Sequence, residues 1–562
     1  MTTAVHTAPS TTTVTAAAPL VKLRPVVHAS PTSRGIHVRG WTSSFTIDGG
    51  AGLWRLWQAI EPSLVAGVPR EKLGPPRARP EVAQAIELIL TQLREHDLLV
   101  EVPAGWEQTG PDTPPAAVAA WLESVAADPA GAWRRLRQAQ VRIIGSGPVA
   151  DAATRALTDA GVTVRTEPGR QPVVLHVDAV TAVAAAATGE VGYVLPLTPV
   201  AQVRQVATQV AARLGVSADD PPPPYALAGL VGGAAAHRLI CAVAGLPDPA
   251  QDAAALGADT AATLTPEHPA VLVARLDPLR ASYHPWLPAA PAATAAPTGD
   301  LDAALARLDA LCDPELGLVT PARPGELPQV PAALAVAGDA LGIGVTGDTA
   351  RLDAALQAAA DALHTTVGTD VVVGVDSPHA TGVALRRWVH THLADLPNAA
   401  VAEAEWADSP AARRWWKALT LRFGVPATLR VRRLAPNLVH ARVDAGGETL
   451  AWAVEATPAD AVAFAALAAT GLIQARRAGL DPTGPVTLTG AAPAWRPEHL
   501  DSAQWTDLRW YWPAGVADLE PRVQAAIRQL GAPTPTPLTS DTAPALLPAL
   551  AAVGFVALTP AV

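Results

Sequence analysis

The stretch of this sequence most like a chemical motif is a glycine turn after a short apolar run. The run Val141–Ile144 leads into a turn and helix start that contain Gly145, Gly147 and Ala150. Glycines here let a phosphate approach the backbone, and the N-terminus of a following helix attracts anions. Nucleotide binding would also need an acidic residue at the end of the next strand. The expected strand Val162–Arg165 ends in arginine, with Glu167 beyond it. We therefore interpret the turn as a vestigial nucleotide loop and keep nucleotide binding as an alternative.

Other sequence patterns of catalysis and metal binding are missing. The sequence contains no H-E-x-x-H, C-x-x-C, G-x-S-x-G or Walker A pattern. Its two cysteines, Cys241 and Cys312, are too few for a disulfide framework or a Cys-based zinc site. His284 has no cysteine or histidine nearby in the sequence that would complete a metal site. We expect neither a catalytic residue nor a metal site.

Composition narrows the class of protein and its partners. The chain has 562 residues and a net charge of −10, which does not suit nucleic-acid binding. Its first twenty residues lack the basic and apolar regions of a signal peptide. The apolar stretch Tyr225–Leu246 contains Arg238, whose charge would be costly inside a membrane. We expect a cytoplasmic protein with neither nucleic-acid nor membrane partners.

The elements that would position a binding site begin after a tail over residues 1–21. Three short β-like runs are separated by turn residues, namely Leu23–His28, Gly35–Arg39 and Ser44–Asp48. A helix is predicted to start at Pro80, and its apolar residues keep to one face, namely Val82, Ile86, Ile89, Leu90 and Leu93. The strand Leu98–Val102 closes the block. The pattern predicts an α+β winged helix over residues 22–103.

Two larger blocks follow, separated by Pro/Ala-rich linkers. In residues 116–284, the strand, turn, helix and strand around Gly145 open a Rossmann-like βαβ unit. Further strands are expected at Val173–Val177 and Gly192–Leu197. Residues 301–562 mix strands with Ala-rich helices such as Asp348–His364 and Pro458–Ala475. The sequence therefore predicts a multidomain α/β protein.

The first two blocks resemble a known family. The segment LRPVVHASPTSRGIHVRGWTSSFTIDGGAGLWRLWQAI, with the helix from Pro80, resembles the winged-helix leader-recognition domain (RRE) of proteins that mature ribosomal peptides. VRIIGSGPVADAATRALTDAGVTVR and LAGLVGGAAAHRLICAVAGLPDP resemble the E1-like part of ocin-ThiF-like proteins. These are partner subunits of azoline cyclodehydratases in thiopeptide and linear azole peptide pathways, which together belong to the TOMM group. The resemblance covers about half of the chain.

The chain departs from active members of the E1 group. E1 enzymes adenylate a carboxylate and hold a structural zinc with two C-x-x-C pairs. At the corresponding places this chain has TPVAQVRQVATQVAARL and WLPAAP. The resemblance therefore does not imply adenylation here.

The third block resembles a YcaO domain, the ATP-using cyclodehydratase. ARLDALCDPELGLVT is similar to its opening, and GIGVTGDTARLDAALQAAADAL to its first ATP-site helix. Working YcaO enzymes hold Mg-ATP with glutamates, because the ion prefers hard oxygen ligands. In place of that glutamate cluster, the helix Asp348–His364 carries Asp353, Gln357, Ala360 and Asp361. The helix Pro458–Ala475 carries Ala468, Ala469 and Thr470. The resemblance implies a degenerate YcaO-like α+β pseudo-domain that docks an active YcaO partner.

The function that the resemblance implies is a leader-peptide-binding accessory subunit of a YcaO-dependent cyclodehydratase. Its partner would form thiazolines or oxazolines in a ribosomal precursor peptide, and the leader would add to the winged helix as a β-strand. The residues expected to contact the leader are Ser44, Phe45, Thr46, Ile47, Gln84, Glu87, Leu88 and Arg94. For Phe45 and Ile47, filling the domain core is an equal alternative. The subunit would have no cofactor of its own, ATP and Mg²⁺ belonging to the partner, and could form homo- or hetero-oligomers.

Two other functions remain open from the residues. The chain could be a nucleotide-binding (ATP or NAD(P)) Rossmann enzyme that acts on a small molecule. It could also be a DNA-binding winged-helix regulator, which the acidic charge disfavours.

Overall fold

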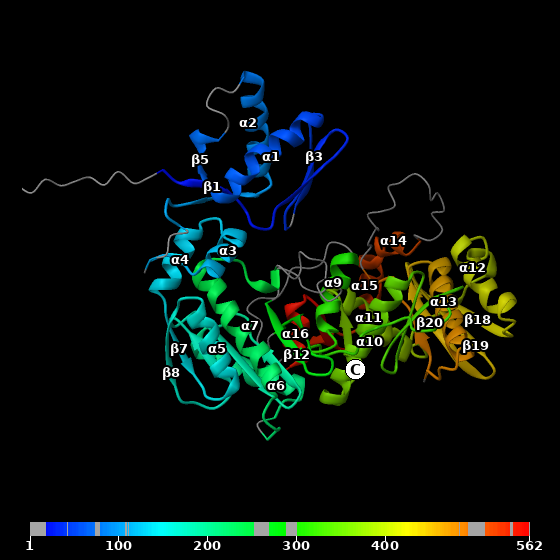
Figure 1. Ribbon diagram of the computed structural model, residues 1–562. Coiled ribbons are helices and arrows are strands. Elements are labelled where there is room, and N and C mark those ends of the chain that lie inside the picture. The colour runs from blue at the N-terminus through cyan, green and yellow to red at the C-terminus, as the bar shows by residue number, and fades with distance from the viewer. Residues whose placement is uncertain are drawn as a thin grey trace, which may run out of the picture. The chain divides into compact units, whose positions relative to one another are not determined.

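Figure 1 shows the computed structural model of the chain. It describes residues 18–41, 43–73, 79–106, 110, 112–217, 219–251, 269–287, 301–482, 484–492, 512–539, 543 and 545–560. The chain divides into two compact units. Unit 1 comprises Met1–Ala207, Ser217–Ala261 and Leu272–Ser282, and unit 2 comprises Thr208–Val216, Ala262–Val271 and Tyr283–Val562. Mixed α/β structure in more than one part is what the sequence predicts.

Unit 1 opens with a small α+β domain, here called the N-terminal domain (residues 20–102; blue in Figure 1). Its strands form two three-stranded sheets, with the orders β5-β1-β6 and β2-β3-β4. The strands are β1 (Leu20–Leu23), β2 (His28–Pro31), β3 (Gly35–Arg39), β4 (Ser44–Asp48), β5 (Val68–Pro69) and β6 (Leu99–Val102). The helices are α1 (Ala51–Ala66), the 3-10 turn η1 (Arg70–Lys72) and α2 (Pro80–Glu95). The expected strands at β3 and β4 and the start of α2 at Pro80 are confirmed.

The first expected strand, Leu23–His28, is wrong: the structure has a turn there between two strands. β1 ends at Leu23 and β2 begins at His28. Between them, the amide of Val27 donates to the carbonyl of Arg24 at 3.1 Å, with Pro25 second in the turn. Proline suits that position because its ring fixes φ near the value that a turn requires.

One hydrophobic core joins the N-terminal domain's helices to both sheets. Its buried side chains come from α1, α2, β1, β3, β4 and the adjoining turns, and include Leu53, Trp57, Leu64, Ile86, Ile89, Leu90, Leu93, Ile36, Val38 and Ile47. The apolar face predicted for α2 is therefore the face that packs, with Val82 partly buried at its edge.

After the N-terminal domain, unit 1 contains most of a seven-stranded sheet of order β13-β12-β11-β10-β9-β7-β8. Its strands are β7 (Gln140–Ile144), β8 (Thr163–Glu167), β9 (Val173–His176), β10 (Ala182–Thr188), β11 (Val191–Val194), β12 (Ala270–Arg275) and β13 (Arg280–Pro285). The helices are α3 (Ala116–Val125), α4 (Pro129–Gln138), α5 (Pro148–Asp159), α6 (Val200–Leu214) and α7 (Tyr225–Ala244).

The predicted Rossmann-like topology holds for one βαβ unit. β7 and β8 pair in parallel through α5, as the glycine turn indicated. In contrast, β7 pairs antiparallel with β9, β9 with β10, β10 with β11, and β11 with β12. Local strand and helix signals carry no information on strand direction, which depends on the connections. The expected Rossmann-like α/β domain is therefore built on a mixed, mainly antiparallel sheet.

The long apolar helix α7 is a packed helix of unit 1. It lies against α5, where a Cβ added to Gly232 would come within 2.4 Å of the carbonyl of Val149. Arg238 is 2% exposed, and its guanidinium pairs with Asp248 at 2.8 Å. By length and composition alone, α7 and α13 (Pro458–Arg477) could each span a membrane, and 56% and 78% of their apolar windows are buried inside the protein. Such burial is typical of core helices.

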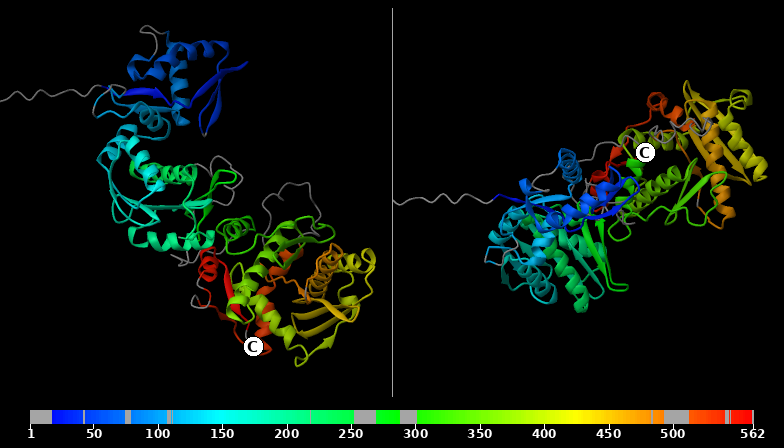
Figure 2. Two further views of the ribbon diagram at one scale, coloured as in Figure 1. Left: turned by 60° about the horizontal axis from the view of Figure 1, so that its bottom comes forward. Right: turned by 45° about the horizontal axis from the view of Figure 1, so that its top comes forward.

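Unit 2 contains several small sheets and most of the remaining helices (Figure 2). The sheet orders are β14-β15, β16-β23-β22 and β17-β18-β19-β20-β21. The strands are β14 (Ala333–Ala337), β15 (Ala340–Gly344), β16 (Val372–Gly374), β17 (Ala399–Ala400), β18 (Ala427–Ala435), β19 (Leu438–Ala445), β20 (Glu448–Glu455), β21 (Val486–Thr487), β22 (Thr536–Pro537) and β23 (Val556–Thr559). The helices are α9 (Leu301–Leu311), α10 (Gly347–Val367), α11 (Ser377–Thr391), η3 (Glu403–Glu405), α12 (Pro410–Lys417), the π-helical η4 (Ala418–Arg422), α13, α14 (Trp512–Ala517), α15 (Glu520–Gln529) and α16 (Leu546–Ala552).

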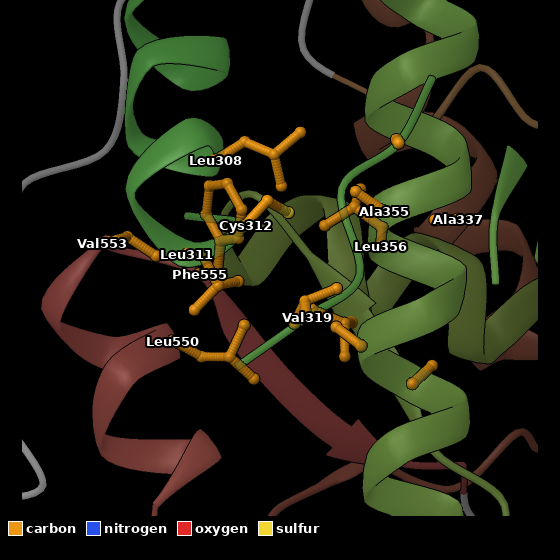
Figure 3. Close-up of a cluster of buried hydrophobic side chains, with 14 of the residues drawn as sticks. Leu308, Leu311, Cys312, Val319, Ala337, Ala355, Leu356, Leu550, Val553 and Phe555 are labelled. Atoms are coloured by element: carbon orange, nitrogen blue, oxygen red, sulfur yellow. The ribbon is translucent and has the colours of Figure 1, made fainter. Parts of the chain in front are cut away.

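Two of the hydrophobic cores in unit 2 are built around its long helices α13 and α10. One lies between α13 and the strands β19 and β20. The other joins α9, α10, α16 and β23, and Figure 3 shows Cys312 among Leu308, Leu311 and Phe555. Burial in these apolar surroundings raises the pKa of the Cys312 thiol to about 12. A buried thiol with a raised pKa is a poor nucleophile.

Candidate functional site

Strand β4, where the sequence predicts peptide contact, lies at the edge of its sheet. β3 occupies the middle, between β2 and β4, so one side of β4 has no strand beside it among the described residues. The β3–β4 ladder is antiparallel and runs from the pair Gly35–Asp48 to the pair Arg39–Ser44. An unpaired strand edge presents a row of backbone donors and acceptors to another chain.

The register fixes which backbone groups of β4 face that open edge. Bonds from the amide of Gly40 to the carbonyl of Ser43 and from Gly49 to Arg34, both 2.8 Å, flank the ladder. Hydrogen-bonded and non-hydrogen-bonded pairs alternate along an antiparallel ladder. Alternation leaves every second residue of β4 with its N–H and C=O directed at the open edge, namely Ser44, Thr46 and Asp48.

The side chains of β4 divide between the two faces of the sheet. Ser44 and Thr46 lie on the outer face, where their hydroxyls are 3.0 and 3.1 Å from the two ring nitrogens of His37. Ile47 is 4% exposed and belongs to the domain core, so its side chain is not accessible to a peptide. Phe45 is partly buried and stacks on His96 with ring centroids 3.9 Å apart. Of the two residues with an alternative role, Ile47 takes the core role.

The predicted residues of α2 are exposed but point in different directions. Gln84, Glu87 and Arg94 are exposed, and Leu88 is 45% exposed. At 3.6 residues per turn, Leu88 lies about 80° around the helix from His96, and Gln84 about 120°. Arg94 lies about 160° away and Glu87 about 180°. Since His96 marks the side of α2 next to Phe45, Leu88 points closest to that side, and Glu87 and Arg94 point away from it.

The structure adds two residues that sequence reasoning missed. Asp48 belongs to the outward set of β4, and the period of two starting from Ser44 could have identified it. His96 forms the floor beneath Phe45, and no local signal marks it because the contact joins the end of α2 to β4.

The N-terminal domain is anchored to α3 by a buried polar cluster, here called the Glu123 junction (Lys22, Arg24, Trp106 and Glu123). The Oε1 atom of Glu123 accepts from Lys22 Nζ at 3.0 Å and from Trp106 Nε1 at 2.7 Å. The backbone carbonyl of Glu123 accepts from Arg24 Nη1 at 2.8 Å. The three charged residues are each at most 5% exposed. The junction fixes β1 of the N-terminal domain against α3.

The glycine turn opens α5, as the sequence predicts, but part of it is used within the fold. The amide of Gly145 donates to the carbonyl of Glu167 at 3.0 Å, so this donor is already satisfied. The carboxylate of Glu167 pairs with Arg142 on the surface. Gly147 caps α5 with φ 96°, and a Cβ added there would meet no atom within 4 Å, whereas Ala150 is buried. The N-terminus of α5 is therefore accessible at Gly147, but the nearby amide of Gly145 is already used in a hydrogen bond within the fold.

The residues that the sequence resemblance aligns with YcaO glutamates lie on α10 and α13. Asp353 Oδ2 accepts from the amide of Ile343 at 3.0 Å and from Gln357 Nε2 at 2.9 Å. Burial raises the pKa of Asp353 to about 6, although both hydrogen bonds act in the opposite direction. On α13, Ala468, Ala469 and Thr470 are buried in a hydrophobic core. Within the described parts of the chain, no three His, Cys, Asp or Glu side chains gather as metal ligands would.

Sequence comparisons give no match: no family model and no curated protein matches this chain. Among solved structures, the chain is similar to one described as a heterocyclase in complex with substrate and cofactor. That similarity has a TM-score of 0.50 and 12% identity, and covers 96% of this chain and 94% of the other. E. coli MccB with ATP aligns over 47% of this chain and 96% of its own length, with 10% identity and a TM-score of 0.31, too low to define a shared fold. The chain therefore shares its overall fold with a heterocyclase along nearly its whole length.

Proposed function

We propose that this chain is the leader-binding accessory subunit of a YcaO-dependent cyclodehydratase. Its N-terminal domain, a winged helix in this proposal, captures the leader of a ribosomal precursor peptide as an added strand beside β4. The partner enzyme activates backbone amides with ATP and closes thiazolines or oxazolines. The chain itself contributes binding and positioning, with no catalytic side chain. The subunit acts in the cytoplasm, where precursor peptides are made.

The observation that carries the proposal is the open edge of β4. The backbone groups of Ser44, Thr46 and Asp48 are directed at this edge, and no described residue pairs with them. Pairing to such an edge supplies affinity through main-chain hydrogen bonds, and nearby pockets supply side-chain specificity. An added strand would lay alternate side chains toward α2, where Leu88 is an exposed apolar residue.

Unit 2 supports the division of labour between this chain and a partner. The places that resemble YcaO glutamate positions hold two aspartates, one glutamine and one alanine on α10, and two alanines and a threonine on α13, namely Asp353, Asp361, Gln357, Ala360, Ala468, Ala469 and Thr470. This set contains no glutamate cluster. Alanine offers no oxygen to a magnesium ion, which needs several hard oxygen ligands. Holding the leader nearby raises the effective concentration of the core peptide at the partner's active site.

A single proline substitution at the edge of β4 tests the proposal. Thr46→Pro removes an amide that points to the open edge. Because Thr46 does not donate to β3, every hydrogen bond of the β3–β4 ladder is kept. The matched control is Thr46→Val, which keeps the amide and the side-chain size. The probe is the fluorescein-labelled leader of a Cys/Ser/Thr-rich ribosomal precursor peptide, and its binding is measured by fluorescence anisotropy. Loss of one hydrogen bond weakens binding roughly 2- to 12-fold, and the clash of the proline ring adds to it.

Two outcomes would contradict the proposal. Equal leader affinity for Thr46→Pro and Thr46→Val, both folded by circular dichroism, would remove the strand edge as the binding site. ATP turnover with peptide cyclisation by this protein alone would remove the division of labour. Micromolar binding of ATP or NADPH in calorimetry, with leader affinity absent, would favour the nucleotide-dependent enzyme instead.

A further inference from the structure

Unit 2 contains a cavity of about 630 Å³ that the proposed function does not use. It is enclosed by β15, α10, α11, α13 and the segment around Thr487–Gly490. Cavities of 300–1,000 Å³ that combine apolar walls with a few polar groups are typical of small-molecule sites. The cavity is therefore large enough for an organic ligand.

One wall of the cavity is a polar stripe along α10. Thr349, Asp353, Gln357 and Asp361 recur every four residues and so project from one side of the helix. The carboxylate of Asp361 has no hydrogen-bond partner among the described residues, and His364 follows it one turn later with Nδ1 2.8 Å from the carbonyl of Thr369. The stripe offers mainly hydrogen-bond acceptors to the cavity.

The other walls are apolar. Phe464 and Leu467 from α13, Val373 from β16, Val383 from α11 and Leu488 face the same space. A ligand that fills the cavity would thus meet acceptors on one side and hydrocarbon on the other.

The charges around the cavity are mostly negative. Arg387 is already paired with Asp370, with 2.9 Å between Nη1 and Oδ1. Burial lowers the pKa of His379 to about 4, so its ring is uncharged at neutral pH. Three further carboxyl groups line the cavity without a salt bridge among the described residues, namely Asp339, Asp353 and Asp361. Burial raises the pKa of Asp361, and the charge of Arg387 acts in the opposite direction. The field of these groups attracts cations and repels phosphates.

We propose that this cavity binds an organic cation, a protonated amine attached to an apolar body. The ammonium group pairs with the carboxylate of Asp361, and the apolar body packs on Phe464 and Leu467. Asp353 lies two turns away on α10, about 12 Å along the helix axis, and adds to the negative field. A nucleotide fits poorly because its phosphates would face these carboxylates. A bare metal ion fits poorly because the described carboxylates do not gather into a ligand cluster and most of the cavity would stay empty.

Three probes of similar size and different charge test the proposal with the full chain: 2-phenylethylammonium, 2-phenylethanol and 3-phenylpropanoate. Saturation-transfer NMR and calorimetry should show binding of the cation, weaker binding of the alcohol and no binding of the anion. The double variant Asp353→Asn/Asp361→Asn should bind the cation roughly tenfold more weakly, because one charge-assisted contact and a second negative charge of the cavity are lost. The control Asp348→Asn lies on the same helix, is 56% exposed and lies outside the cavity lining, and should bind as the wild type does.

A folding failure of the double variant is separated from a lost site by circular dichroism and by the single variant Asp361→Asn, which should lose roughly two- to fivefold because its carboxylate is more exposed. Three outcomes would overturn the proposal. The anion could bind more tightly than the cation, the cation affinity could be unchanged in both variants, or the cation could fail to bind at about 10 mM. Leader affinity is measured separately and does not depend on these outcomes.

Discussion

The Glu123 junction provides a sharp test of how the N-terminal domain is held. Glu123→Gln keeps the size of the side chain and an oxygen that accepts from Trp106, and removes the negative charge 3.0 Å from Lys22. The side chains of Lys22 and Glu123 are nearly inaccessible, at 6% and 5% exposure. Removing one partner of a buried ion pair costs about 3–5 kcal/mol, and the retained hydrogen bond places the expected loss near the lower end. A loss of about 3 kcal/mol raises the population of the opened junction on the order of 100-fold.

Hydrogen exchange followed by mass spectrometry measures this opening region by region. Peptides from β1, β6 and α3 should exchange faster in Glu123→Gln, whereas peptides from β7 and α5 should keep the wild-type rate. The double variant with Lys22→Met completes a mutant cycle. Because the second substitution removes the buried cation that Glu123 balanced, the double variant should be less destabilised than the sum of the two single variants, by about 2 kcal/mol or more.

Additive losses would refute the reasoning, because they would mean that Lys22 and Glu123 do not stabilise each other. Unchanged protection of β1 and α3 in Glu123→Gln would refute it more directly, because the junction would then contribute nothing to the anchoring of the domain.

Two further predictions concern packing and pH. Gly232→Ala should destabilise unit 1 by about 1–3 kcal/mol through overpacking, because the added Cβ would meet the carbonyl of Val149 at 2.4 Å. Gly233→Ala is the matched control: its Cβ would meet nothing within 4 Å. By helix propensity it should be neutral or stabilising by up to about 1 kcal/mol in urea unfolding. In unit 2, burial raises the pKa of Glu455 from 4.5 to about 7, against the attraction of Arg386. The folded state then binds this proton more tightly than the unfolded chain does, so the residue's contribution to stability falls as pH rises from about 4.5 to 7. Glu455→Gln should flatten that part of the profile, and an identical slope in both proteins would contradict the assignment.

Local signals in the sequence were sufficient for many individual elements. Pro80 and the apolar spacing from Val82 to Leu93 located α2 and its buried face, because a helix must turn one stripe toward the core. Alternation and turn residues located β3 and β4. The turn at Pro25 was missed because the flanking residues have the same apolar character as a continuous strand.

The candidate site could be predicted only in part. The sequence identified the β4 segment and the exposed face of α2, but it grouped Glu87 and Arg94 with Leu88, although helical geometry separates them. It also left the role of Ile47 open, because an apolar residue on a strand can face either the core or a partner. Its place in the core became clear from the contacts of β4 with the rest of the domain.

By itself, the sequence determined where strands and helices form and which of their faces are apolar, since these depend on neighbours a few residues apart. Tertiary structure decided that β4 is an edge strand, that most of the seven-stranded sheet is antiparallel, and that the polar stripe on α10 lines a cavity. Each of these properties depends on which distant segment lies alongside. That choice follows from the packing of the whole chain, because strand order and enclosed volume arise from contacts between residues far apart in the sequence.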